Sequence, residues 1–297
     1  MTQPTTRSGE DLLAAETGMD AVGLRVGDLA LMSSYYRDAL GLETLSERGS
    51  SVVLGRGLTP LVVLEHASGL PVSSRSQAGL FHTALLFDTR AALAATVYQA
   101  SRDRRSSFAG SADHLVSEAF YFTDPEGNGI ELYVDRDRSE WVYRNGRIEM
   151  QTLALDPNRY LRENLQGSGD AAPNSQAKVG HVHLQVGDVA TARAFYVDAL
   201  GFEITAELPG ALFVSAGGYH HHMAMNTWNS RGAGPRAASL GLAEVAITVP
   251  TRADLDALSE RLRHRSIPVQ DDGNRLRVDD PWSTPVTLSV GEASASH

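Results

Sequence analysis

Cysteine is absent from the 297 residues of the chain. This absence excludes disulfides, thiolate nucleophiles and sulfur-ligated metals, so any metal must be held by imidazole, carboxylate or water. Apolar runs long enough to cross a bilayer are also missing. The opening residues lack the charged and apolar regions of a signal peptide. We therefore expect a cytoplasmic protein that has no membrane partner.

Positive charge is scarce. The 26 lysines and arginines are outnumbered by 36 aspartates and glutamates, which leaves a formal net charge of -10. No basic stripe could neutralise a phosphate backbone, so we expect no nucleic-acid partner. The length and the 42% of hydrophobic residues suffice for one or two buried cores. General frequency favours a homo-oligomer.

An internal repeat organises the chain. The stretch "VGDLALMSSYYRDALGLE" (26–43) matches "VGDVATARAFYVDALGFE" (186–203) without a gap, at an offset of 160 residues. We interpret the two halves as duplicates. Each half divides again into two units of order βαβββ, because an alternating strand, a helical segment and three short strands recur.

The predicted modules span 19–70, 78–135, 180–228 and 239–292. Residues 1–18 are expected to form a flexible N-terminal arm. Residues 136–179 are expected to form a linker that could cover a site as a lid. The fold class is therefore α+β.

Four such modules carrying "GHVHLQVGD" and "FTDPEGNGIELY" resemble the vicinal oxygen chelate superfamily over roughly residues 20–291. With "AGGYHHH" added, the sequence is similar to the type I extradiol ring-cleaving dioxygenases, the branch of catechol 2,3-dioxygenase. The resemblance implies two half-open barrels of the glyoxalase and extradiol dioxygenase type. The same scaffold also serves isomerases, transferases and binding proteins.

The resemblance further implies that metal ligands project inward from the first and last strands of each module. The first-strand positions of the four modules are Ala21, His82, His181 and Glu244, and the last-strand positions of modules two and four are Glu131 and Thr287. Neither sequential pair of modules holds three ligands. Modules two and three together supply His82, His181 and Glu131, which is the two-histidine, one-carboxylate set of non-haem Fe(II) oxygenases.

We therefore predict an Fe(II) site between modules two and three, which Mn(II) could also occupy. Modules one and four would pair elsewhere without a cofactor. The best-known extradiol enzymes carry the metal in modules three and four, so this pairing departs from their pattern. His183 is the chief rival ligand, because it lies on the same strand face as His181. An arginine beside Glu131 would be another way to offset the burial of its carboxylate.

The triple histidine "HHH" at 220–222 supplies the predicted catalytic residue. If the stretch is a strand, His220 and His222 point one way and His221 the other. Extradiol enzymes keep a non-ligating acid-base histidine just before a short apolar strand, and the resemblance places it at His221. His220 and His222 are expected to support it or to pack at the domain surface. An adventitious metal-binding tract is the alternative.

Two further residues follow from the resemblance. Tyr121 corresponds to a catalytic phenol that is hydrogen-bonded to a substrate oxygen, unless it is a plain core aromatic. His114 lies in the loop where these enzymes keep a second histidine that contacts substrate, unless it is merely solvated. We therefore predict His221 and Tyr121 as catalytic residues and His114, His183 and His222 as substrate-binding residues.

The expected activity is Fe(II)-dependent extradiol cleavage of a catechol-type diol by dioxygen, which gives a 2-hydroxymuconic-semialdehyde-type product. Two alternatives stay open. A glyoxalase-like isomerase or hydrolase would use Zn(II), Ni(II) or Mn(II) as a Lewis acid and would favour more carboxylates among its ligands. A metal-free small-molecule binding protein of the same fold would need no histidine at those positions.

Overall fold

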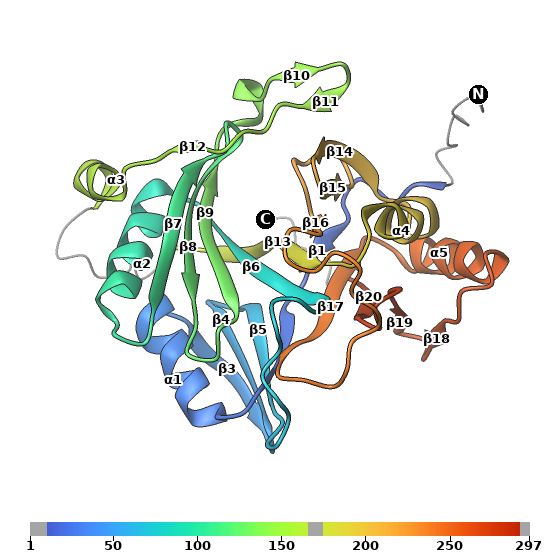
Figure 1. The fold of residues 1–297 in the computed structure, drawn as a ribbon, viewed down its shortest axis with the longest axis horizontal. Coiled ribbons are helices and arrows are strands. Elements are labelled where there is room, and N and C mark those ends of the chain that lie inside the picture. Colours follow the sequence, from blue (N-terminus) through green and yellow to red (C-terminus); the bar gives the residue numbers. More distant parts are fainter. Residues whose placement is uncertain (1–10, 166–174, 292–297) are drawn as a thin grey trace.

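The computed structural model describes residues 11–165 and 175–291, and these form the four predicted βαβββ modules (Figure 1). Module one comprises β2 (Val22–Val26), α1 (Leu29–Leu40), β3 (Glu43–Arg48), β4 (Ser51–Arg56) and β5 (Thr59–His66). Module two comprises β6 (Gly79–Phe87), α2 (Arg90–Arg102), β7 (Ser107–Asp113), β8 (Ser117–Thr123) and β9 (Gly129–Asp135).

The second half repeats this order. Module three comprises β13 (Ala177–Gln185), α4 (Val189–Ala192), the π-helical segment η3 (Arg193–Ala199), β14 (Glu203–Leu208), β15 (Ala211–Ser215) and β16 (Met223–Asn226). Module four comprises β17 (Gly241–Val249), α5 (Arg252–His264), β18 (Gln270–Asp271), β19 (Arg275–Asp279) and β20 (Pro285–Val290). Strand β13 begins three residues before the predicted start of its module at 180.

The modules pair across the halves of the chain. One sheet runs β12-β7-β8-β9-β6-β13-β16-β15-β14 and joins modules two and three through the antiparallel pair β6–β13. The other runs β18-β19-β20-β17-β2-β5-β4-β3 and joins modules four and one through β17–β2. The predicted pairing of modules is confirmed by this strand order. Neither sheet closes into a barrel, which agrees with the half-open architecture expected from the resemblance.

The repeated helices begin and end for the same physical reasons. The Asp28 side chain accepts from the backbone N–H of Leu31 at the start of α1, and Asp188 does the same for Thr191 at the start of α4. Gly41 ends α1 at φ 66°, a left-handed conformation that glycine adopts without steric cost. The helices flank the sheets in Figure 1, and one continuous cluster of buried side chains runs through all four modules.

A duplicated hydrogen bond connects consecutive modules. Tyr36 on α1 donates to Asp124, which follows β8, at 3.0 Å. Tyr196, 160 positions later, donates to Asp280 at the same distance. The tyrosines thus join module one to two and three to four, while the sheets join two to three and four to one. The four modules form a closed ring of contacts.

The ends of the predicted domains differ from expectation. Residues 11–18 are packed rather than free, because Leu13 is 8% exposed and its N–H donates to the carbonyl oxygen of Gly201. This part of the predicted flexible arm is wrong, and residues 1–10 lie outside the described chain. β1 (Gly18–Met19) then pairs with β17.

The predicted linker contains ordered elements over 136–165. They are η2 (Arg138–Glu140), β10 (Tyr143–Arg144), β11 (Arg147–Ile148), β12 (Leu153–Ala154) and α3 (Pro157–Asn164). β12 pairs with β7 of module two, and Arg147 hydrogen-bonds to the carbonyl oxygen of Ile204 in module three. The segment therefore crosses from one module to the other. Its residues 166–174 lie outside the described chain. Among the described helices, none combines the length and apolar character needed to span a membrane.

The tyrosine-aspartate bond leads to a stability prediction. Burial raises the pKa of Asp124 to about 6, so the carboxyl is ionised at pH 7 and Tyr36 donates to a buried charge. We expect Tyr36→Phe to lower the free energy of unfolding by about 1.5–3 kcal/mol, measured by urea denaturation. Tyr143→Phe is the control, because Tyr143 is 56% exposed, and should change it by less than about 0.5 kcal/mol. Equal effects of the two changes would contradict the proposed link.

Candidate metal centre

Strand register brings the three predicted ligands together. Glu131 on β9 is paired with Ala84 on β6, and Ala84 is paired with His181 on β13. These three residues therefore form one row across the sheet. His82 lies two positions from Ala84 on β6 and so shares its face. The small side chain of Ala84 leaves the space between the ligands open.

A β-bulge sets the position of His181. The register of β13 against β6 shifts between Val179 and His181, at Gly180. A Cβ atom at Gly180 would lie 1.7 Å from the Tyr133 hydroxyl oxygen, so only glycine fits there.

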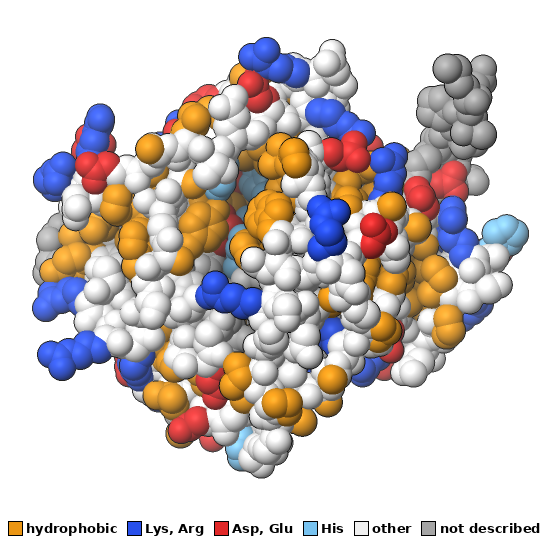
Figure 2. All heavy atoms as spheres, viewed as in Figure 1, with side chains coloured by type: hydrophobic (Ala, Val, Ile, Leu, Met, Phe, Trp, Pro, Cys, Tyr) orange, Lys and Arg blue, Asp and Glu red, His pale blue; other side chains and the backbone are white. Residues whose placement is uncertain are grey.

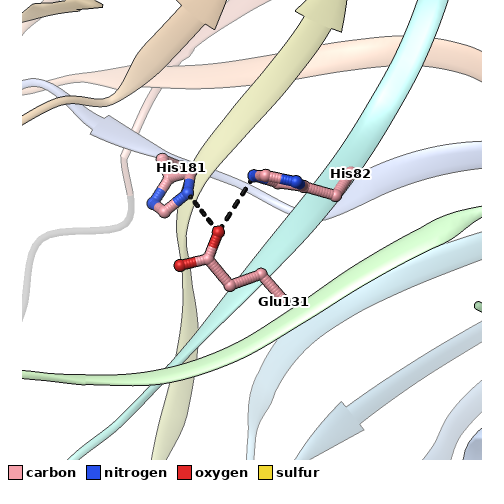
Figure 3. Close-up of side chains that lie close together, drawn as sticks. All are labelled: His82, Glu131 and His181. Carbon is pink, nitrogen blue, oxygen red and sulfur yellow. Dashed lines mark hydrogen bonds and ion pairs between the residues drawn. The ribbon is translucent and has the colours of Figure 1, made fainter. Parts of the chain in front are cut away.

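The three side chains meet at one carboxylate oxygen (Figure 3). Glu131 Oε2 lies 2.9 Å from His82 Nε2 and 3.1 Å from His181 Nε2. One donor atom from each residue lies within 4.8 Å of the others. All three residues are buried, at 6%, 3% and 1% exposure for His82, Glu131 and His181.

The electrostatics of this cluster call for a cation. Burial lowers the pKa of His181 to about 4, so its imidazole is neutral at pH 7. Burial alone would raise the pKa of Glu131, but its two histidine partners hold that pKa well below the ordinary range. Within the described chain, no lysine or arginine pairs with Glu131. A buried carboxylate beside a neutral imidazole is costly unless a cation offsets it.

The donor set fits a divalent metal ion. His82 Nε2 is buried and has no hydrogen-bond partner among the described residues, although it lies beside Glu131. Two imidazole nitrogens and one carboxylate, with further positions left for exogenous ligands, are the protein ligands of mononuclear Fe(II) oxygenases. His82, His181 and Glu131 would hold such an ion.

The cluster lies at the bottom of a cavity of about 730 Å³. Figure 2 shows this hollow, with histidine side chains in its depth and hydrophobic side chains around it. Phe81, Phe213 and Trp228 are among the apolar residues of its wall. Trp228 is 51% exposed and stands at the rim. Met150, Gln151 and Thr152 of the linker also line the cavity.

Tyr121 and His114 form a hydrogen-bonded pair in this wall. Tyr121 on β8 is the register partner of Glu131, and its hydroxyl lies 2.7 Å from His114 Nε2. His114 Nδ1 lies 2.7 Å from the carbonyl oxygen of Gln151, which can only accept. A neutral His114 therefore donates from Nδ1 and accepts the Tyr121 proton at Nε2. The structure thus brings both predicted residues to the cavity.

His183 also lines the cavity, but its Nε2 has a partner of its own. Asn226 Nδ2 donates to His183 Nε2 at 2.9 Å. Burial lowers the pKa of His183 well below its ordinary range, so the ring is a neutral acceptor. This nitrogen is occupied by Asn226, and the cluster of potential ligands does not include His183.

The triple histidine lies in irregular backbone between a turn and β16 rather than in a strand. Gly217 and Gly218 have φ values of 62° and 67°, and β16 begins only at Met223. The predicted strand alternation is therefore wrong, yet His221 still lines the cavity, with its ring centroid 4.0 Å from that of His181. Burial, followed by neighbouring histidines, lowers the pKa of His221 well below its ordinary range.

The neighbours of His221 point elsewhere. His220 is fully buried behind it and hydrogen-bonds to it. His222 does not line the cavity: its Nδ1 accepts from the N–H of Ala216, and its ring packs against Tyr219. The prediction that His222 contacts substrate is therefore corrected, because the turn directs its side chain away from the ligands.

The sequence reading missed several cavity residues. Phe213 and Trp228 lie on or next to strands whose pairing could not be deduced, and Arg75 precedes β6 in a loop. Their apolar or basic character alone carries no signal of a site. Asp135 and His220 were also missed as partners, because 85 residues separate them in the chain.

Comparisons with known proteins agree with this geometry. The family model described as "Glyoxalase/Bleomycin resistance protein/Dioxygenase superfamily" matches residues 18–132 and 178–278. The chain therefore belongs to this superfamily. The crystal structure of glyoxalase I from Zea mays superimposes with a TM-score of 0.57 at 17% identity, over 93% of this chain and 92% of that one, which shows the shared fold.

Sequence relatives show which branch of the superfamily the chain resembles. A catechol-2,3-dioxygenase of Bacillus subtilis (strain 168) is 35% identical over 274 residues, which are 90% of this chain and 95% of that protein. A biphenyl-2,3-diol 1,2-dioxygenase of Rhodococcus globerulus is 30% identical over 115 residues, which are 38% of this chain and 60% of that protein. The resemblance to the extradiol dioxygenases is confirmed, and the chain is an enzyme of that type.

The role of Glu131 is tested by a matched pair of substitutions. Glu131→Gln keeps the side-chain shape but removes the charge, so we expect purified, Fe(II)-reconstituted protein to lose most of its bound iron in elemental analysis. Glu244→Gln is the control, because Glu244 is a glutamate on the first strand of module four, in the other sheet, and accepts a hydrogen bond from Thr287. Wild-type iron content in Glu131→Gln, or an equal loss in both variants, would reject the assignment.

Proposed function

We propose that the protein is an Fe(II)-dependent extradiol dioxygenase that opens a catechol-type ring beside its two hydroxyl-bearing carbons. Both atoms of dioxygen enter the product, a 2-hydroxymuconic semialdehyde or its substituted analogue. The observation that carries the proposal is the convergence of His82, Glu131 and His181 at the bottom of a cavity. The 35% identity to a catechol-2,3-dioxygenase supports it.

Fe(II), when bound, supplies Lewis acidity and one-electron chemistry toward dioxygen, which amino-acid side chains lack. The chain contributes the ligands and a surrounding cavity that orients the ring. Phe81, Phe213 and Trp228 provide apolar faces for an aromatic substrate. The volume of about 730 Å³ lies within the range of roughly 300–1,000 Å³ typical of pockets for drug-sized ligands. We therefore propose a catechol that carries an apolar substituent.

Tyr121 and His114 bind the hydroxyl side of the substrate in this proposal. With His114 as the Nδ1–H tautomer, the Tyr121 proton is directed to His114 Nε2, and the lone pairs of the Tyr121 oxygen can accept a hydrogen bond from a substrate hydroxyl. The contact from His114 Nδ1 to the carbonyl oxygen of Gln151 fixes this direction. The linker thus orients the pair as well as covering the site.

His221 is the acid-base residue of the proposal. Its burial in the cavity keeps the ring neutral, so it can accept a proton from a substrate hydroxyl and return it later in the reaction. No net proton is consumed, which matches the balance of the overall reaction. His183, held by Asn226, forms the adjacent wall.

Oxygen consumption tests the reaction class. Protein purified anaerobically and loaded with Fe(II) should consume dioxygen with catechol in about a one-to-one ratio and form a yellow product. Loading separate samples with Mn(II) and with Zn(II) distinguishes redox chemistry from a Lewis-acid reaction. Turnover of a glyoxalase-type substrate without oxygen uptake would select the isomerase instead. Tight catechol binding without turnover by any of the loaded samples would select a binding protein.

Substitution of His221 tests its role separately. His221→Gln should keep the iron content of the wild type and lower kcat by about 10²- to 10⁴-fold, because proton transfer is lost while the ligands remain. His66→Gln is the control, since His66 is exposed on β5 of the other sheet. Stopped-flow absorbance and iron analysis give the two readouts. Wild-type turnover in His221→Gln would remove it from the mechanism.

A further inference from the structure

A chain of hydrogen bonds leads from His221 out of the cavity to Asp135 at the end of β9. His221 Nδ1 lies 2.7 Å from His220 Nδ1, and His220 Nε2 lies 2.9 Å from Asp135 Oδ1. The other carboxylate oxygen of Asp135 accepts from the Tyr219 hydroxyl at 2.9 Å. His220 is fully buried, whereas the Asp135 side chain is 23% exposed. The chain therefore joins the cavity to a partly solvated carboxylate.

The direction of each hydrogen bond follows from its acceptor. A carboxylate can only accept, so His220 Nε2 must carry the hydrogen it shares with Asp135. In a neutral His220 ring, Nδ1 then has a lone pair and no hydrogen. The short contact between the two Nδ1 atoms therefore requires His221 to donate. This leaves His221 with its hydrogen on Nδ1 and a lone pair on Nε2.

The lone pair on His221 Nε2 lies on the side of the ring that faces the cavity. Among the described residues, no hydrogen-bond partner is found for His221 Nε2, and this atom is not among the buried unpaired ones. The ring is held in place by His181 and Phe213, whose centroids lie 4.0 and 5.2 Å away. One nitrogen is thus tied to His220 and the other faces the space that the substrate would fill.

We propose that Asp135, acting through His220, is a positioning residue that holds His221 as the Nδ1–H tautomer with the Nε2 lone pair directed into the cavity. The tautomer follows from the hydrogen bonds of a neutral His220, while its consequence for turnover rests on the proposed function. A base must present a lone pair to the proton it accepts. Without Asp135 the two histidines can exchange donor and acceptor, and His221 would then present an N–H.

The matched control is Tyr219→Phe, which removes the other hydrogen bond to the Asp135 carboxylate. Tyr219 donates to the second oxygen of Asp135, and Tyr133 lies within hydrogen-bond distance of Tyr219. Tyr219→Phe removes this donor but leaves the contact between Asp135 and His220 intact. If the role of Asp135 were purely structural, Tyr219→Phe and a substitution of Asp135 would affect the enzyme to a similar extent. If Asp135 positions His221, only the substitution of Asp135 changes the tautomer of His221 and the turnover.

The test is the ring nitrogen spectrum of His221 in protein labelled with [¹⁵N]histidine. The 31.9 kDa protein is loaded with diamagnetic Zn(II), and the His221 signals are assigned by their loss in His221→Gln. We expect a protonated Nδ1 and an unprotonated Nε2 in the wild type and in Tyr219→Phe. In Asp135→Leu, which offers no acceptor, we expect a mixture of both tautomers. A protonated Nε2 in the wild type, or an unchanged spectrum in Asp135→Leu, would overturn the proposal.

Kinetics of the Fe(II) enzyme give the second readout. Asp135→Asn retains the side-chain shape but offers one acceptor in place of two, so we expect kcat to fall by about ten- to a hundredfold at unchanged KM and iron content. Tyr219→Phe should lower kcat far less. Unchanged kcat in Asp135→Asn would refute the positioning role. The wild-type spectrum needs no turnover, so failure of the proposed activity and failure of the tautomer assignment are distinguishable, even if the Asp135 variants do not fold.

Discussion

The arrangement of this molecule depends on one buried carboxylate. Glu131 is 3% exposed, and its partners are two imidazoles rather than a lysine or an arginine. Such a group is tolerated in an apolar strand only when positive charge reaches it. A divalent ion held between Glu131, His82 and His181 would supply that charge at a position that lines the cavity. The same cation would therefore offset the buried charge of Glu131 and supply the chemistry of the site.

The duplicated fold explains why only one sheet carries the site. Both sheets join two modules through the same kind of antiparallel contact, but the positions that hold His82 and His181 in one hold Ala21 and Glu244 in the other. Glu244 accepts a hydrogen bond from Thr287 and forms no ion pair with a histidine among the residues that the structure describes. The second sheet thus keeps the scaffold and its tyrosine-aspartate links without the ligands.

The candidate metal cluster could be predicted because duplication and strand periodicity locate the modules, and the resemblance to the superfamily implies which strand positions carry ligands. Those positions hold His82, Glu131 and His181 only in modules two and three, which gave the predicted pairing. The three histidines at 220–222 were expected to alternate as in a strand because they precede an apolar run, whereas they lie between a turn at Gly217 and Gly218 and the start of β16. This error misplaced His222, while His221 reached the cavity through the turn. The partner of His183 is Asn226, 43 residues away, and no sequence pattern reveals such contacts. The packing of Leu13 against Gly201 was missed for the same reason.

The polar residues that line the cavity come from modules two and three and from the linker. The linker carbonyl at Gln151 orients His114, and Asp135 orients His221 through His220, so each of these two histidines is held by a partner further from the candidate ligands.

The most direct test of the candidate metal site is a crystal structure of the Fe(II)-loaded protein with anomalous data at the iron edge. We expect one peak, bonded to His82, His181 and Glu131. A peak at other residues, or none between these three, would contradict it.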